Sequence, residues 1–291
     1  AGSGTVALTA GSGGITAATA NNTTAEIATT GATVTLNTSG TVGTSANRIQ
    51  FANNATTTQQ NVVVGSVGTQ PSAVFLDGLN DLTLGNITTS TTNANVSVTA
   101  LGGLNVAGTI NSGTGTISLG ADRTYADAAG DGTGTLSLLA SSSVTSANTS
   151  TSAITLRGAD MAIDGTAGVT ATGVGGGVQI FSSVNTRPIA LGDTNGTAVA
   201  GINLNDAELA RISNYGTLTV GEAGAQIGAI TVTTVTNPVA AGSLVLNANG
   251  VGGGIVLNDT GSEATPVVAT ALAAGSGTVA LTAGSGGITA A

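Results

Sequence analysis

The chain has 291 residues, of which 46 are glycine, 41% are hydrophobic and only 7% are charged, with a formal net charge of −9. Ordinary globular domains carry about 25% charged residues, so Thr, Ser and Asn must supply most of the polar surface of this chain. Disordered chains combine low hydrophobicity with high charge, which is the opposite of this composition. We therefore expect the chain to fold.

The composition also excludes several classes of function. All five basic residues are arginine, and an acidic chain without clustered cations cannot neutralise phosphates, so we expect no nucleic-acid partner. No uninterrupted apolar run reaches the length of about 18 residues that a membrane-spanning helix needs. The absence of Cys rules out a disulfide framework and thiol chemistry.

Short units in which two apolar residues flank a third residue recur along the chain, bounded by Gly, Asn, Ser or Asp. This period-two alternation predicts short strands with one buried face. Thr and Val between the apolar positions suit a pleated surface, and Gly and Asn supply corners that need positive φ. In chain order the units are 6–8, 34–36, 49–51, 74–76, 82–84, 96–98, 104–106, 117–119, 136–138, 154–156, 178–180, 202–204, 218–220, 230–232, 244–246 and 255–257.

One stretch, residues 206–212, carries a helical pattern instead. Asn205 precedes it and Glu208 follows three residues after Asn205, a spacing typical of a capping box. We predict a helix of about two turns that lies outside the sheet structure.

A sandwich, a propeller and a solenoid can all use many short strands, but the spacing favours the solenoid. Inward apolar residues recur at fairly even intervals at Leu119, Leu138, Leu156, Ile180 and Leu204. Repeats of about 20 to 50 residues that stack into a continuous core are typical of solenoids. The prediction is an all-β fold, a parallel β-helix (β-solenoid) with three short strands in each rung.

The first eighteen residues, AGSGTVALTAGSGGITAA, return unchanged at 274–291. We interpret 1–273 as one β-helical tandem repeat and 274–291 as the start of the next identical repeat in the same solenoid. A whole number of rungs, roughly 12 to 14 of about 20 to 23 residues, would let the stack continue without a break. Neighbouring copies would then join head to tail, each covering the edge strands of the last.

Three stretches, 4–18, 154–169 and 187–221, carry a resemblance to a known family. They read GTVALTAGSGGITAA, ITLRGADMAIDGTAGV, and RPIALGDTNGTAVAGINLNDAELARI followed by GTLTVG. The chain resembles the filamentous haemagglutinin-like proteins, the giant exoproteins of two-partner secretion in Gram-negative bacteria. The resemblance implies a secreted, right-handed parallel β-helix used for adhesion, biofilm formation or a surface layer. No secretion-domain signature and no Arg-Gly-Asp motif is present, so no receptor follows from it.

The densest polar cluster, GADRTYADAAGDG at 120–132, is a candidate metal site. Asp122, Asp127 and Asp131 would supply the hard oxygen ligands of a calcium ion, the one cofactor that the sequence suggests. The stretch matches neither the EF-hand spacing nor the Gly-Gly-x-Gly-x-Asp nonapeptide. A solvated loop between rungs is the competing interpretation.

A second candidate is the carboxylate pair of Asp160 and Asp164. With alternation, Met161 and Ile163 face inward and both carboxylates face outward, where Arg157 is a candidate partner for Asp160. Outward carboxylates could act on a substrate, but a solvated face is the competing interpretation.

Two further features have structural interpretations. The glycine triplets at 175–177 and 252–254 lack the Gly-Lys-Ser/Thr ending of a phosphate-binding loop, so we predict corners there. Phe75 lies between two inward residues and should point outward, packing beneath a loop or against a neighbouring filament.

Enzymes that cleave polysaccharides also use parallel β-helices, and they need clustered carboxylates or an acid with a tuned pKa. This chain has no His and no Lys, and its fourteen acids are spread thinly. We therefore expect no enzyme. The resemblance implies instead a structural segment of a rigid extracellular fibre or surface adhesin on a Gram-negative bacterial cell. Other filaments, a host surface or a polysaccharide are its expected partners beyond neighbouring copies. The alternative is a carbohydrate-binding or carbohydrate-cleaving β-helix module.

Overall fold

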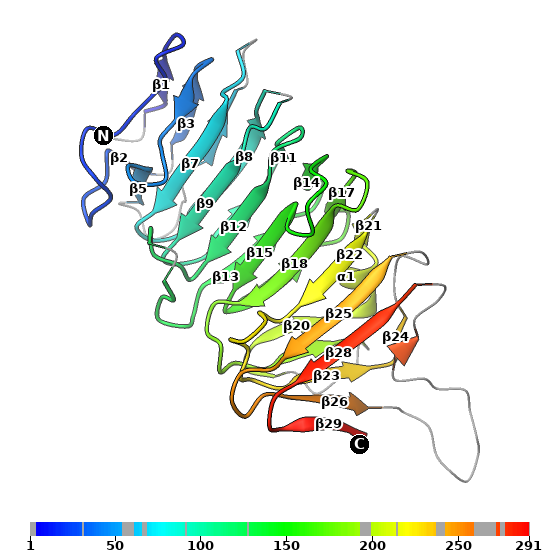
Figure 1. Ribbon diagram of the computed structural model, residues 1–291. Coiled ribbons are helices and arrows are strands. Elements are labelled where there is room, and N and C mark those ends of the chain that lie inside the picture. Colours follow the sequence, from blue (N-terminus) through cyan, green and yellow to red (C-terminus); the bar gives the residue numbers. More distant parts are fainter. Residues whose placement is uncertain are drawn as a thin grey trace.

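A computed structural model describes residues 4–30, 32–53, 61–65, 69–90, 92–126, 128–192, 199–213, 215–236, 242–258, 272–273 and 277–290. The strands form long parallel stacks, in which strands from successive turns of the chain pair side by side (Figure 1). The fold is a parallel β-helix, as predicted. Among the described residues, no helix has the length and apolar character to cross a membrane.

Two eleven-stranded sheets make up most of the stack. The front sheet, nearest the viewer in Figure 1, holds β2 (Ile27–Thr29), β4 (Thr41–Val42), β5 (Ile49–Asn53), β7 (Ala73–Gly78), β9 (Val96–Ala100), β12 (Ile117–Ala121), β15 (Ile154–Gly158), β18 (Gly177–Ser182), β22 (Thr217–Val220), β25 (Ser243–Ala248) and β28 (Val279–Ala283). The back sheet holds β1 (Val6–Thr9), β3 (Thr33–Asn37), β6 (Asn61–Val64), β8 (Leu82–Thr88), β10 (Leu104–Val106), β11 (Thr109–Asn111), β13 (Thr135–Leu138), β14 (Ser143–Ser146), β16 (Asp160–Ile163), β17 (Gly168–Ala171) and β21 (Ile212–Ser213).

Two smaller sheets complete the other end. The lower sheet has five strands in the order β20 (Ile202–Leu204), β19 (Ile189–Leu191), β23 (Ile230–Thr233), β26 (Gly254–Asn258) and β29 (Gly287–Ala290). A two-stranded sheet pairs β24 (Val235–Thr236) with β27 (Leu272–Ala273).

Three strands per coil are clearest in the middle of the stack. The back sheet divides at β8, whose first half pairs with β10 and whose second half pairs with β11. From there each coil contributes one strand to the front sheet and two to the back sheet: β9–β10–β11, β12–β13–β14 and β15–β16–β17. These coils match the predicted rung.

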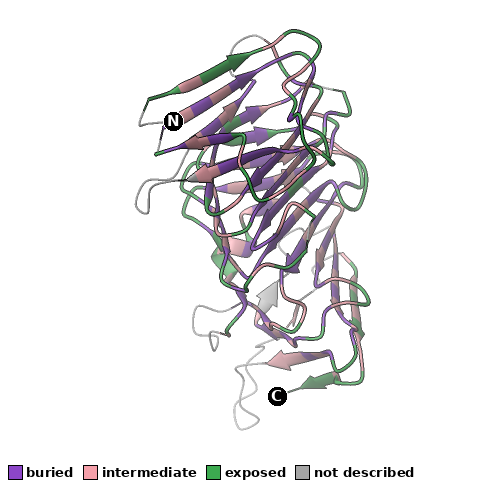
Figure 2. Ribbon diagram, turned by 90° about the vertical axis from the view of Figure 1, so that its left-hand side faces the viewer, coloured by how far each residue is buried: buried purple, intermediate pink, exposed green. Residues whose placement is uncertain are grey.

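The core is a continuous column of aliphatic side chains between the sheets. On the front sheet Val98, Leu119, Leu156 and Ile180 stack directly upon one another, and all four are fully buried. Figure 2 shows buried residues along the inside of the stack between its two ends, where the terminal strands are more exposed. Removing such side chains from water stabilises the fold by roughly 1.5 to 3 kcal/mol each.

Outward side chains also stack. Ser97, Ser118, Thr155, Gln179 and Thr219 lie opposite one another on five successive front strands. The Thr155 hydroxyl donates a hydrogen bond to Gln179 Oε1 at 3.1 Å. Such ladders of small polar groups explain how so weakly charged a chain presents a polar surface.

Coil length varies more than the sequence spacing suggested. Val96 lies opposite Ile117 of the next coil, whereas Val169 lies opposite Ile212, about twice as far along the chain. The extra residues lie in the connections between strands. The number of rungs in the segment 1–273 stays a prediction.

The stacking predicted from the leucine spacing was therefore only partly correct. Leu156 does lie opposite Ile180, but Leu119 lies directly opposite Leu156. Leu138 lies in the back sheet, and Leu204 lies in the lower sheet. One coil carries inward leucines on more than one face, so their sequence intervals mix distances within a coil with distances between coils.

The two identical eighteen-residue segments lie on different faces. Val6–Thr9 forms β1 in the back sheet and pairs with β3, whereas the same sequence within Val279–Ala283 forms β28 in the front sheet and pairs with β25. We expected the second copy to repeat the position of the first, and in this structure it does not. Neither copy has a fully buried face, and register is weakly specified where no face is buried. The division of the chain into tandem repeats stays a prediction.

The predicted corners and helix are present. Gly175 and Gly252, in the two glycine triplets, have φ of +79° and +93°, values that favour glycine. Helix α1 (Asp206–Leu209) begins with the predicted capping box at Asn205, but it makes a single turn because the chain enters β21 at Ile212. Phe75 points outward and is half-buried, as expected.

Candidate functional site

Asp122, the first predicted calcium ligand, is a structural residue of the connection between β12 and β13. It is fully buried. Its Oδ1 accepts a hydrogen bond from the Gly132 amide at 2.9 Å, and its Oδ2 accepts one from the Ser183 hydroxyl at 2.5 Å. The carboxylate thus closes its own loop and ties it to the corner that follows β18.

Asp131 lies in the same connection but is exposed. It accepts hydrogen bonds from the Thr133 hydroxyl at 2.6 Å and the Thr133 amide at 3.0 Å, which lower the pKa of the Asp131 carboxyl. Asp127 lies outside the described residues. Within the described part of the chain, no three or more His, Cys, Asp or Glu side chains gather as a metal site would require. The three-carboxylate calcium site stays a prediction.

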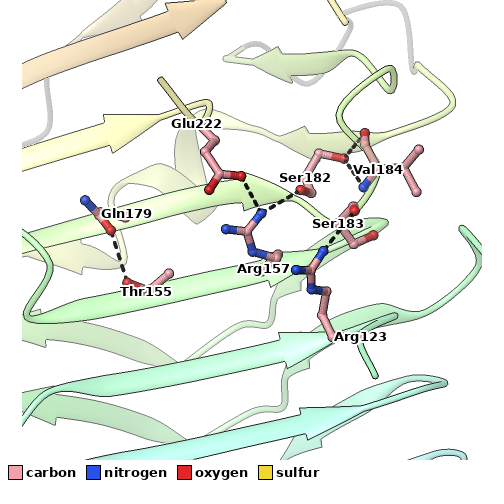
Figure 3. A network of polar contacts seen from close by, with 8 residues as sticks. All are labelled: Arg123, Thr155, Arg157, Gln179, Ser182, Ser183, Val184 and Glu222. Carbon is pink, nitrogen blue, oxygen red and sulfur yellow. Dashed lines mark hydrogen bonds and ion pairs between the residues drawn. The ribbon is translucent and has the colours of Figure 1, made fainter. Parts of the chain in front are cut away.

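Two buried arginines lie across the outer side of the front sheet (Figure 3). Arg157 Nη1 is 2.8 Å from Glu222 Oε2 and 3.3 Å from the Ser182 carbonyl oxygen. Its guanidinium carbon lies 4.9 Å from the centre of the Phe181 ring, a favourable cation–π geometry. Arg123 Nη1 donates to the Ser183 carbonyl at 3.2 Å. Each arginine therefore joins one coil to a later one.

The predicted pairing of Arg157 with Asp160 was wrong. Asp160 Oδ1 instead accepts a hydrogen bond from the Met161 amide at 2.8 Å. Arg157 lies opposite Phe181 on the neighbouring strand, and the Glu222 side chain, which follows β22, contacts the Arg157 guanidinium. Stacking of the coils thus brings Arg157 closer to Glu222 than to Asp160, although Asp160 is nearer in the sequence. The Arg157 guanidinium lowers the pKa of Glu222 through its hydrogen bond.

A second buried ladder was not foreseen. Gln50, Asp77 and Thr99 occupy the same register position on three successive front strands and are almost fully buried. Gln50 Nε2 donates to Asp77 Oδ2 at 2.9 Å, and the Thr99 hydroxyl donates to Oδ1 at 2.7 Å. Burial raises the pKa of Asp77, although both hydrogen bonds act against the rise. No sequence motif marks this ladder, since only the register brings the three residues together.

A cavity of about 230 Å³ opens beside Asp77. Its walls are largely apolar and include Leu79, Leu101 and the ring of Tyr125. Because both Asp77 carboxylate oxygens already accept hydrogen bonds, that group serves the fold first. The cavity has room for a small apolar group, and its walls offer that group few polar atoms for hydrogen bonding.

The second predicted site, Asp160 and Asp164, lies on β16 and just after it. Met161 and Ile163 are buried, Asp160 is half-buried and Asp164 is exposed, as the alternation predicted. Asp164 Oδ1 accepts a hydrogen bond from the Gly165 amide at 2.8 Å. Each carboxylate thus binds the amide that follows it in the chain.

Asp164 lines an open groove of about 470 Å³ between β13, β16 and α1. Glu208 Oε1 accepts a hydrogen bond from the Ile163 amide at 3.1 Å, and Arg211 donates to the Ile163 carbonyl and to the Gly165 carbonyl. Within the described residues β16 pairs with β13 alone. Glu208 and Arg211 therefore satisfy the backbone of β16 where a neighbouring strand would otherwise do so. The groove lining contains no aromatic ring.

The fold and its polar clusters define a class of protein: a parallel β-helix whose buried polar side chains join one coil to another. Comparison with known proteins found no matching family model, no matching curated protein and no matching solved structure.

Proposed function

We propose that the chain is a structural segment of a large secreted repeat protein that forms a rigid extracellular fibre or surface adhesin of a Gram-negative bacterium. One observation carries the proposal: three ionisable side chains are buried within the stack and bonded between coils. Asp122, Asp77 and Arg157 each join residues of different coils and are nearly or fully buried. Groups fixed in this way stabilise a stack and present little to a substrate.

The strand pairing and the continuous core support the same proposal. Each interior strand on the path from β2 to β28 pairs on both sides, and the aliphatic column beneath it runs without a break. Bending such a stack would stretch backbone hydrogen bonds and open a close-packed core. In the fibre, neighbouring copies join head to tail. The family resemblance in the sequence supports the secreted location.

Immunogold electron microscopy tests the proposal. Antibodies against the folded chain are applied to intact cells that produce the full-length protein. The proposal expects labelling at regular intervals along filaments outside the cell. Labelling that appears only after the cells are permeabilised would overturn the location, and labelling of isolated points without filaments would overturn the fibre.

The carbohydrate-binding alternative has one observation in its favour, the open groove beside Asp164. An array of soluble and cell-surface polysaccharides tests it with the unmodified chain, with Asp164→Asn and with Asp131→Asn. Asp131 is an exposed carboxylate outside the groove and serves as the matched control. Binding or cleavage that Asp164→Asn abolishes and Asp131→Asn preserves would favour the alternative over the fibre.

A further inference from the structure

The three faces of the β-helix are not equally continuous. The front sheet runs unbroken from β2 to β28 (Figure 1). The back sheet, in contrast, ends at β16 and β21. The lower sheet begins with β20, which lies beside β16 without forming a ladder with it. The break falls on the coil that leaves β18 and returns at β22.

This coil contains four strands, β18 to β21, one more than each of the three coils before it. Both β19 and β20 belong to the lower sheet, and their order there is the reverse of their order in the chain. Ile189 of β19 pairs with Ile202 of β20 on one side and with Ile230 of β23 on the other. From this coil to the next, the front sheet advances one strand, from β18 to β22, while the lower sheet advances two, from β20 to β23.

Strand pairing on the third face is also interrupted at this point. Strand β21 pairs with β17, but within the described residues it does not pair with β24 of the following coil. The lower face is therefore wider here by one strand than the front sheet. Parallel strands lie about 4.8 Å apart and stacked sheets about 10 Å apart, so one added strand on one side corresponds to a bend of roughly 25°.

We infer that the insertion of β19 builds a fixed bend into the β-helix, with the front sheet on its concave side. The bend is held by side chains. Glu208 and Arg211 cap the interrupted edge of β16 at Ile163. On the other side of β19, Gln226 Nε2 donates to the Arg187 carbonyl at 2.8 Å, which ties the entry to β19 to the next coil.

The bend has a consequence for the proposed fibre, and this consequence rests on the proposed function. Copies joined head to tail would each contribute one bend in the same sense. The fibre would then wind about an axis instead of running straight.

Distances between spin labels test the bend in the single chain, whether or not it forms a fibre. The chain has no native Cys, so two introduced cysteines label cleanly. One pair, Ser118→Cys with Val245→Cys, spans β12 to β25 on the front sheet. The other, Ser137→Cys with Val256→Cys, spans β13 to β26 on the opposite side of the same coils.

In the unmodified background the second distance should exceed the first by about one strand spacing, roughly 4.8 Å. Deletion of 185–199 removes β19 and leaves a short connection between β18 and β20. In this variant the two distances should become equal. As a control, deletion of 124–128 shortens another long connection without removing a named strand, so it should preserve the difference.

Two results would overturn the inference. One is equal distances in the unmodified background, a comparison that stands even where the deletion variant does not fold. The other is an unchanged difference in a deletion variant that keeps its β-sheet circular dichroism.

Discussion

Arg157 and Glu222 are 65 residues apart in the sequence, yet they form an ion pair with Nη1 2.8 Å from Oε2. Arg157 lies on β15 and Glu222 follows β22, so the pair crosses over β18. The ring of Phe181, on β18, lies against the guanidinium. Three successive coils are thus joined by one side chain.

Arg157→Ala should destabilise the chain by about 2 kcal/mol, because it removes the ion pair, the ring contact and the hydrogen bond to Ser182. Glu222→Gln should cost less than about 1 kcal/mol, since the Glu222 side chain is 37% exposed and water screens the pair. Urea unfolding followed by circular dichroism measures both. Equal effects of the two changes would contradict this order.

The Glu222 pair also predicts a dependence on pH. Arg157 lowers the pKa of Glu222 in the folded chain, so the pair stabilises the fold above the unfolded pKa of about 4.3. This contribution is lost as the pH falls through the folded pKa. The urea midpoint of the unmodified chain should therefore approach that of Glu222→Gln on acidification, and a gap that persists at pH 2 would refute the assignment.

The contribution of Asp77 to stability should depend on pH in the direction opposite to that of Glu222. Burial raises its pKa, so the folded state binds a proton more tightly than the unfolded state, and ionisation costs stability as the pH rises above about 3.9. Asp77→Asn keeps the shape and an acceptor for Gln50 without the charge. At pH 7 it should be at least as stable as the unmodified chain, with its advantage vanishing once the pH falls below the unfolded pKa. If Asp77→Asn destabilised the chain most at pH 7, the folded state would favour the ionised Asp77 carboxylate, and this prediction would be wrong.

Core packing can be tested with two leucines of equivalent strand units. Leu119 is fully buried at the centre of the stack, whereas Leu8 on β1 is 38% exposed. Leu119→Ala should cost about 2 to 5 kcal/mol through lost burial and a residual cavity. Leu8→Ala, the matched control, should cost less than about 1 kcal/mol because much of that side chain stays in water. Comparable losses would argue against a continuous core.

Trypsin should cut the folded chain very slowly. The chain has no lysine, and each of its five arginines is protected by burial, by its hydrogen bonds or by a following proline. Arg48, Arg123 and Arg157 are buried, Arg187 precedes Pro188, and Arg211 is bonded to Ile163 and Gly165. Cleavage should therefore follow unfolding, with little digestion under native conditions and complete digestion in urea. Rapid cutting of the native chain after Arg211 would show that α1 opens on its own.

Local features were predictable because their causes are local. The capping box of Asn205 and Glu208 depends on a short spacing within one turn, and alternation in 154–164 correctly assigned Met161 and Ile163 to the core. The contacts of Arg157 and Asp77 were not predictable in this way. They depend on register between coils of unequal length, and no spacing in the sequence encodes that register.

The unequal coils have a practical consequence. The short return from Val96 to Ile117 and the longer return from Ile117 to Ile154 both bring the chain to the next place in the front sheet, so residues added outside the strands leave the axial position of a front strand unchanged. Foreign peptides placed within 124–128 should therefore be displayed at a fixed height along the axis. The molecule can serve as a scaffold that holds inserted sequences at defined distances from one another.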